Sequence, residues 1–159
     1  MAISMQKYEV MGTSKALPSI VYALLVDGRS WSEWMGVDAV DIEPSSSVDG
    51  SAAAVSRVGE IRLVRTNQYV SREQIVELIP DRKFSYIVLD GMLHDYRGDV
   101  ALTSSPEGGT EICWRGVFRM SFPLAGWFMQ LYLARFMQRA VNKLARYAEQ
   151  VQVERCGGG

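Results

Sequence analysis

The sequence lacks the short motifs that mark nucleotide, metal and serine chemistry. Its 159 residues contain no GxxxxGK[ST], no GxGxxG, no HExxH and no GxSxG, the patterns that hold phosphates, dinucleotides, catalytic zinc and a nucleophilic serine. Only two cysteines occur, Cys113 and Cys156, and they show no metal-ligand spacing and suggest no disulfide framework. We therefore expect a protein that uses no metal and no cofactor.

Long apolar runs and a surplus of charge are also missing. No segment offers the roughly 18 consecutive apolar residues of a membrane span, and the opening MAISMQKYEV lacks the basic start, apolar run and cleavage site of a secretory signal. The formal net charge is −1, whereas binding to nucleic acid needs a clear surplus of Lys and Arg to neutralise phosphates. These absences predict a cytoplasmic protein that does not bind nucleic acid.

What the sequence does contain is the composition and patterning of one globular domain. With 159 residues, 48% of them hydrophobic, the chain suits a single core, and we predict one ligand-binding domain over residues 1–153 and a disordered tail over 154–159. A strand is expected at 6–12, a helix between Pro18 and Gly28, and a short helix carrying Trp31 and Trp34.

From residue 36 to 120 the hydrophobic period changes from that of helices to that of strands. Six apolar-alternating segments are separated by short turns such as TN, PDRK and SPEGG, and such short connections join antiparallel strands. The run PSSSVDGSAAAVS is expected to be a loop. A helix then runs from Pro123 to about Val153, with an apolar stripe that includes Leu124, Phe128, Leu131, Met137, Val141, Leu144, Ala148 and Val151.

This order predicts an α+β fold in which a curved sheet of seven strands covers one long helix. A helix of this length is roughly 45 Å long, so its apolar stripe needs the concave face of the whole sheet for cover. The element order and the segments VYALLVDGRSWSEW, VGEIRLV, QIVELIPDRKFSY, DYRGDVALT, GGTEICWRGVF and VNKLARYAE resemble the polyketide cyclase/dehydrase-type branch of the helix-grip (SRPBCC) superfamily, over residues of about 5 to 150.

The resemblance implies a seven-stranded antiparallel sheet that grips a C-terminal helix, with a hydrophobic cavity between them. The same superfamily holds START lipid-transfer domains and birch-pollen-allergen-like proteins, whose ligands are lipids, polyketides, sterols and similar apolar compounds. Its members include enzymes, carriers and receptors, and they share no universal catalytic residue. The resemblance therefore indicates a fold and a class of ligand, but it does not choose between binding and catalysis.

Strand alternation predicts which aromatic side chains face the helix. Along TEICWRGVFRM, Ile112, Trp114 and Phe118 point one way while Glu111 and Arg115 point the other. Tyr and Trp carry polar groups that need partners when buried, and this favours a cavity lining over a dry core, which stays the alternative. The expected ligand-binding residues are Trp31, Trp34, Tyr69, Tyr86, His94, Tyr96, Trp114, Phe118, Phe128, Leu131 and Met137.

Three residues are weak candidates for catalysis. His94 is the only histidine, and histidine is the commonest general acid or base; with Tyr96 it would polarise a carbonyl or carry a proton, provided that no bulge near Gly98 alters the alternation. The other reading of His94 is a polar residue at a strand end. Arg62 would hold a carboxylate or enolate oxygen if it faced the cavity, or else pair with a carboxylate such as Glu60, Glu73 or Glu77 on the outer face.

The sequence leaves three functions open. The first is binding of a hydrophobic small molecule that is polyketide-like, a lipid or an isoprenoid; the second is a cofactor-independent polyketide aromatase/cyclase or dehydratase; the third is a protein-interaction module with a vestigial cavity. A basic stripe on the long helix, formed by Arg135, Arg139, Lys143 and Arg146, suits a solvated face and allows at most transient membrane contact. No feature of the sequence sets an oligomeric state.

Overall fold

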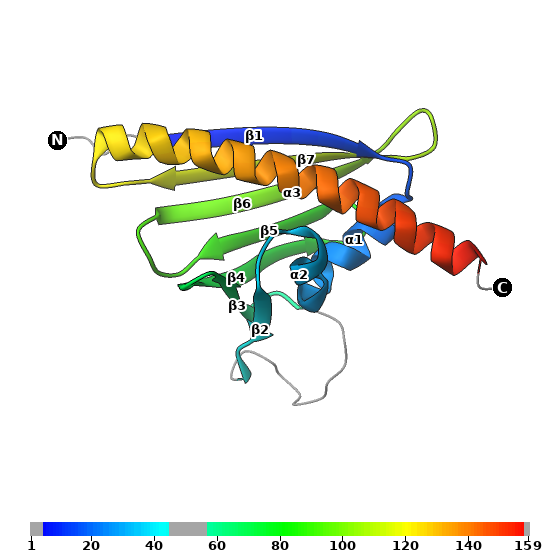
Figure 1. Cartoon of the computed structure of the whole chain (residues 1–159), viewed down its shortest axis with the longest axis horizontal. Coiled ribbons are helices and arrows are strands. Elements are labelled where there is room, and N and C mark those ends of the chain that lie inside the picture. The colour runs from blue at the N-terminus through cyan, green and yellow to red at the C-terminus, as the bar shows by residue number, and fades with distance from the viewer. Residues whose placement is uncertain (1–4, 45–56, 158–159) are drawn as a thin grey trace.

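A computed structural model describes residues 5–44 and 57–157. Its elements follow the predicted order of one strand, short helices, six strands and one long helix (Figure 1). The predicted loop PSSSVDGSAAAVS lies, apart from Pro44, outside the described residues. The elements are β1 (Met5–Ser14), α1 (Pro18–Val26), the 3-10 turn η1 (Gly28–Ser30), α2 (Trp31–Trp34), β2 (Ala39–Ile42), β3 (Ile61–Thr66), β4 (Tyr69–Ile79), β5 (Lys83–Val88), β6 (His94–Ser104), β7 (Thr110–Arg119) and α3 (Pro123–Gly157).

The strands form one antiparallel sheet in the order β1-β7-β6-β5-β4-β3-β2. Strands β2 to β7 are a meander, and β1 closes it by pairing with β7 along its whole length, from Met5 opposite Arg119 to Ser14 opposite Thr110. The predicted TN turn between β3 and β4 is tight because Asn67 adopts a left-handed backbone conformation with φ of 56°, which Asn tolerates better than most residues. The predicted seven-stranded antiparallel sheet is confirmed.

The long helix α3 lies lengthwise beside β1, and α1 and α2 gather against its C-terminal half (Figure 1). Side chains fix this half at the turn that follows β1. Ser14 Oγ donates to the carbonyl of Ala145 at 2.7 Å, and the Lys15 and Leu17 backbone amides donate to Glu149 and Gln152 at 2.8 Å each. These contacts set the angle at which the helix crosses the sheet.

α3 extends further than the sequence predicted. The apolar stripe indicated an end near Val153, but the helix continues to Gly157. Residues 154–157, predicted as part of a disordered tail, are therefore helical, while the last two residues of that tail lie outside the described part of the chain. Side chains in this last segment are exposed. The helix there is therefore stabilised by the helix propensity of its residues and by continuity with the preceding turns, and not by packing against the core.

The core lies between the sheet and the α1/α2 end of α3. Trp31 is its centre, with ring centroids 5.5 Å from Trp34, 5.9 Å from Phe84 and 6.2 Å from Trp114. Aromatic pairs at such distances and tilted angles add to the burial of their large apolar surfaces. The other end of the concave face, beside the N-terminal half of α3, is not filled in this way.

Candidate ligand-binding cavity

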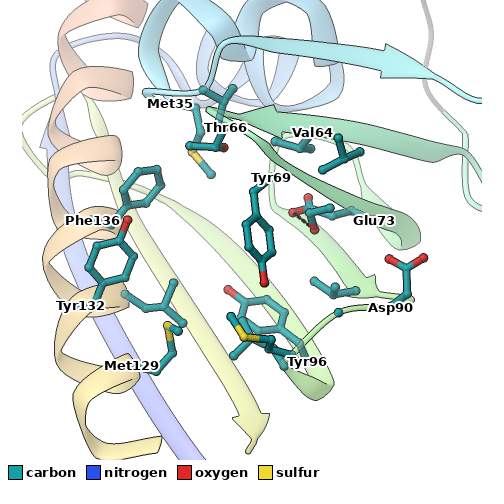
Figure 2. Close-up of a pocket in the computed structure, with 18 of the residues that line it drawn as sticks. Met35, Val64, Thr66, Tyr69, Glu73, Asp90, Tyr96, Met129, Tyr132 and Phe136 are labelled. Carbon is teal, nitrogen blue, oxygen red and sulfur yellow. Dashed lines mark hydrogen bonds between the residues drawn. The ribbon is translucent and has the colours of Figure 1, made fainter. Parts of the chain in front are cut away.

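A cavity of about 640 Å³ opens between the N-terminal half of α3 and the concave face of the sheet (Figure 2). This volume is within the range of small-molecule sites, roughly 300–1,000 Å³. The helix contributes one wall, formed by Met129, Tyr132, Leu133, Phe136 and Met137. Their spacing of three and four residues places them on one side of the helix.

The sheet and the loops around it form the remaining walls. Met35 and Val37 close the end that faces the core, and the β3–β4 hairpin contributes Val64, Thr66, Tyr69, Val70 and Glu73. Strands β5 and β6, with the loop between them, contribute Tyr86, Val88, Met92, Leu93 and Tyr96. Most of the lining is apolar, and flexible Met side chains adapt readily to an irregular ligand.

Glu73 is a carboxylate within this mostly apolar lining (Figure 2). Its Oε1 accepts a weak hydrogen bond from Ser71 Oγ at 3.4 Å. Its Oε2 is shielded from solvent and accepts no hydrogen bond from any described residue. A buried carboxylate oxygen without a donor is costly when it is charged, and this cost favours the protonated form of Glu73.

Burial raises the pKa of the Glu73 carboxyl from its usual value of 4.5 to about 7, against the opposing attraction of Arg62 and the hydrogen bond from Ser71. Arg62 is the cross-strand partner of Glu73, but its Nε donates to Glu60 Oε1 at 3.1 Å. The Arg62 guanidinium therefore neutralises the charge of Glu60 as well as that of Glu73. Its effect on Glu73 does not cancel the effect of burial, and Glu73 ionises close to neutral pH.

Three tyrosine hydroxyls meet at the floor of the cavity. Tyr96 hydrogen-bonds to Tyr8 and, at 3.4 Å, to Tyr86, and Trp114 Nε1 donates to the Tyr86 hydroxyl at 3.2 Å. Burial raises the pKa of all three tyrosines well above the usual value of 10. The hydroxyls are therefore neutral donors and acceptors at physiological pH.

Glycines make room for two of these rings. Gly116 lies opposite Tyr8 on β1, and Gly98 lies opposite Tyr86 on β5. A methyl group on Gly116 would stand 2.1 Å from the Tyr8 ring, and one on Gly98 would stand 2.4 Å from the Tyr86 ring. Any larger residue at either position would push a tyrosine toward the cavity.

The structure brings four of the predicted ligand-binding residues to the cavity. Tyr69, Tyr86, Tyr96 and Met137 all line it. Tyr69 lies at the mouth with 55% of its surface exposed, whereas Tyr86, Tyr96 and Met137 are buried. These four are the residues from the sequence prediction on which a binding site can be built.

Trp31, Trp34, Trp114 and Phe118 are fully buried and do not line the cavity. The inward direction predicted for Trp114 and Phe118 is right, but these side chains fill the core. The polar groups that suggested a cavity have partners within the protein. Trp31 Nε1 donates to the carbonyl of Leu25, and Trp34 Nε1 donates to Ser30 Oγ, each at 3.1 Å.

Phe128 and Leu131 point away from the cavity, with 64% and 41% of their surfaces exposed, so their predicted inward direction is wrong. The N-terminal half of α3, PLAGWFMQLYLARFM, is apolar on every side, and periodicity cannot select one face of such a helix. In the C-terminal half, where polar residues alternate with apolar ones, the predicted Val141, Leu144 and Ala148 are buried.

His94 is exposed and lies outside the lining. The alternation that would turn it inward is broken by a register shift between His94 and Arg97, where Asp95 adopts φ of 52°. A bulge inserts one extra residue and so reverses the facing of everything beyond it. Tyr96 faces inward as predicted, and His94 does not.

Arg62 is 1% exposed but is not part of the lining. Besides Glu60 it donates to the carbonyls of Leu25, at 3.0 Å, and Val26, and its guanidinium lies 5.0 Å from the Trp31 ring centre. The two predicted roles, facing a ligand and pairing on the outer face, are therefore both replaced by a buried ion pair that ties β3 to the end of α1.

Glu73 is the residue that sequence reasoning missed as part of the site. In YVSREQI the acid stands between Arg72 and Gln74, and such polar neighbours are typical of a solvent-facing charge. Alternate residues of a strand point to the same face, and along β4 one such set is Tyr69, Ser71, Glu73 and Ile75. If Tyr69 faces inward, as predicted, Glu73 must face inward too. That parity was the available signal.

Comparison with known proteins agrees with this architecture of a sheet, a gripped helix and a cavity. The sequence over residues 5–149 matches the family described as "Polyketide cyclase / dehydrase and lipid transport". The chain belongs to this family, and its fold is the helix-grip fold. No curated protein matches the sequence significantly.

Solved structures with the same fold are distant in sequence. One domain of the di-domain ARO/CYC protein StfQ, from the steffimycin biosynthetic pathway, superimposes with a TM-score of 0.71 at 17% identity, over 96% of this chain and 52% of StfQ, so the chain spans about half of that protein. XoxI from Bacillus cereus gives 0.66 at 13% identity over 96% and 99% of the two chains. Ara h 8.0201 gives 0.63 at 15% identity over 91% and 98%. Identities this low show the fold alone.

Proposed function

We propose that the protein binds a hydrophobic small molecule, with a polyketide-like, lipid or isoprenoid skeleton, in the cavity between α3 and the sheet. The observation that carries this proposal is the cavity itself, about 640 Å³ with mostly apolar walls and a few polar groups. Apolar walls supply affinity by removing ligand surface from water, and isolated polar groups supply orientation. Membership of a family described by lipid transport and polyketide cyclisation supports the same class of ligand.

The test compares two identical substitutions on α3. Leu133→Trp places a large ring in the cavity, whereas Leu131→Trp changes a residue that lies outside the lining. We expect the first to weaken binding of the neutral fluorophore Nile red by about tenfold or more and the second to change it less than about twofold. Native mass spectrometry of freshly purified protein should show a bound apolar compound, and Leu133→Trp should lose it.

Equal Nile red affinity in the two Trp variants would place the bound dye elsewhere and contradict the proposal. The absence of any co-purified compound, together with no measurable Nile red binding to the wild-type protein, would also contradict it. Melting temperatures close to the wild-type value are needed for both variants, so that a loss of affinity reports the cavity and not unfolding.

A second candidate function is cofactor-independent cyclisation or dehydration of a polyketide in the same cavity. The specific observation that favours it is a carboxyl that ionises close to neutral pH in the same cavity lining as Tyr96. Ionised Glu73 would take a proton from the carbon between two carbonyl groups, and Tyr96 would donate a hydrogen bond to the enolate oxygen. Confinement of the reactive chain would supply part of the rate by proximity.

Turnover of a short poly-β-ketone thioester tests this candidate. Glu73→Gln and Tyr96→Phe should each lower the cyclisation rate by about a hundredfold or more, the range of general acid-base catalysis, while Nile red still binds. A wild-type rate equal to that of the uncatalysed reaction, or both variants at the wild-type rate, would exclude this role.

A further inference from the structure

The charged groups that line the cavity are acids. Glu73 and Asp90 are both in its walls, and none of the lining side chains in the described part of the chain is Lys, Arg or His. Residues 1–4, 45–56 and 158–159, outside that part, contain no Lys, Arg or His in the sequence. Among the described residues, no cationic side chain lines the cavity beside these two acids.

Asp90 and Glu73 differ in the partners that their carboxylate oxygens already have. Asp90 is at the rim, 53% exposed, and lies 3.7 Å from Arg72 Nη1. Glu73 lies deeper, and its Oε2 has no donor among the described residues. The one guanidinium near it, that of Arg62, directs Nε to Glu60 and its two terminal nitrogens to the carbonyls of Leu25 and Val26. Glu73 is thus a carboxylate of the cavity lining with one oxygen to which no described residue donates a hydrogen bond.

Aromatic rings complete this environment. Tyr69, Tyr132 and Phe136 line the walls on the side of the helix and the hairpin (Figure 2). The face of an aromatic ring attracts a cation, and the attraction is strongest where water is excluded. A carboxylate in a lining that also contains aromatic rings and apolar side chains is a suitable environment for an organic ammonium group.

We propose that the ligand of this cavity is a hydrophobic amine, whose protonated nitrogen donates a hydrogen bond to the Glu73 carboxylate while its apolar body occupies the walls of Met, Val and Leu side chains. This inference rests on the proposed binding function and narrows its ligand class. A fatty acid or a phosphorylated lipid is disfavoured, because its anion would meet Glu73 and find no basic side chain in the lining. An alcohol offers a neutral donor and forms a weaker bond.

The pH dependence of binding follows from the groups around Glu73. Charged or titratable groups surround Glu73 on several elements. Arg62 lies on β3 and Glu60 just before it, and Asp90 is at the rim. The tyrosines are Tyr8, Tyr86 and Tyr96 on the sheet and Tyr132 on α3. Burial keeps the sheet tyrosines neutral and leaves Glu73 as the group that ionises near neutral pH. An alkylamine has a pKa near that of Lys, about 10.4, and stays protonated, so its affinity rises as the pH rises through about 7.

The experiment measures displacement of Nile red by decylamine, decanol and decanoate, three ligands with the same chain. For the wild-type protein at about pH 8 we expect decylamine to bind about tenfold or more tightly than decanol, and decanoate to bind most weakly. The preference for decylamine should fall about five- to tenfold at about pH 6, because most of the Glu73 carboxyl is then protonated.

Glu73→Gln keeps the shape of the side chain and removes its charge. We expect this variant to bind decanol within about threefold of the wild type and to lose the preference for decylamine. Asp90→Asn is the matched control, because it removes the rim acid and should keep most of the preference. Equal affinity of the wild type for decylamine and decanol, a preference for decanoate, or a preference that survives in Glu73→Gln would each overturn the proposal. If no decyl compound and no Nile red binds, the proposed function fails as well; if decanol binds without discrimination, only the amine inference fails.

Discussion

Arg62 and Glu73 occupy directly paired positions on β3 and β4, yet the carboxylate that accepts from Arg62 Nε, at 3.1 Å, is that of Glu60. The fold thus places two acids around one buried guanidinium and gives the hydrogen bond to the acid that does not face the cavity. Arg62 stabilises the Glu73 carboxylate only through space, and Ser71 donates a hydrogen bond to it. Several consequences for stability and binding follow from this arrangement.

Removal of the charge at Glu73 should stabilise the ligand-free protein above neutral pH. The folded-state pKa, about 7, lies above the usual 4.5, so between these values the unfolded chain releases a proton that the folded protein keeps. Stability is then lost as the pH rises through this window, by an amount on the order of 2–3 kcal/mol. Glu73→Gln should lack this decline and unfold at higher urea than the wild type at about pH 8. A pH dependence that is the same in both proteins would contradict the raised pKa.

Replacement of Arg62 by lysine should destabilise the protein despite keeping the positive charge. A lysine cannot reproduce the planar fork that reaches Glu60, Leu25 and Val26 at once, and a broken buried pair typically costs about 3–5 kcal/mol. Arg65→Lys on the same strand is the control, since Arg65 is 54% exposed and pairs with an exposed Asp41. Urea unfolding that gives equal losses for the two variants would show that Arg62 is not the structural link described above.

A methyl group on Gly116 should disturb the tyrosine floor. The added carbon would stand 2.1 Å from the Tyr8 ring, and overpacking of this kind costs about 1–3 kcal/mol. Gly157→Ala, where the added methyl meets nothing within 4 Å, should leave the melting temperature unchanged. Combining Gly116→Ala with Tyr8→Val removes the ring that is struck, so the losses should not add; simple additivity would contradict the proposed clash.

Replacement of His94 by alanine should change neither stability nor binding. The side chain is exposed and lies outside the cavity, and surface substitutions usually change stability by less than about 0.5 kcal/mol. Tyr96→Phe, two residues further along the same strand, should by contrast lose hydrogen bonds to two other tyrosines and shift the melting temperature. A loss of Nile red affinity in His94→Ala would contradict the placement of this residue.

The sequence was a good guide where one periodicity held without interruption. Trp114 and Phe118 face inward as strand alternation predicted, because β7 pairs regularly with β1. His94 does not, because a bulge at Asp95 is a local backbone event that leaves little trace in the hydrophobic pattern. Phe128 was placed on the wrong side because an all-round apolar helix has no single face to read.

The boundary between core and cavity could not be predicted from residue types alone. Trp31 and Tyr86 are both buried aromatic residues, but Trp31 packs among Trp34, Phe84 and Trp114 in the core, whereas Tyr86 lies at the edge of the cavity. Which rings are covered depends on the angle of α3, which is set by contacts such as Ser14 to Ala145, 131 residues apart in sequence. Hydrophobic periodicity contains no information on contacts at that range.

The concave face of the sheet is thus divided along its length, with the Trp31 core at one end and the cavity at the other. A substitution at Val70 alters the lining of the cavity, whereas Val70 is not among the residues packed against the core cluster that contains Trp31. Residues at the cavity end can therefore change while the scaffold persists. Such modularity offers a physical reason why chains as little as 13–17% identical superimpose over almost the whole of this domain.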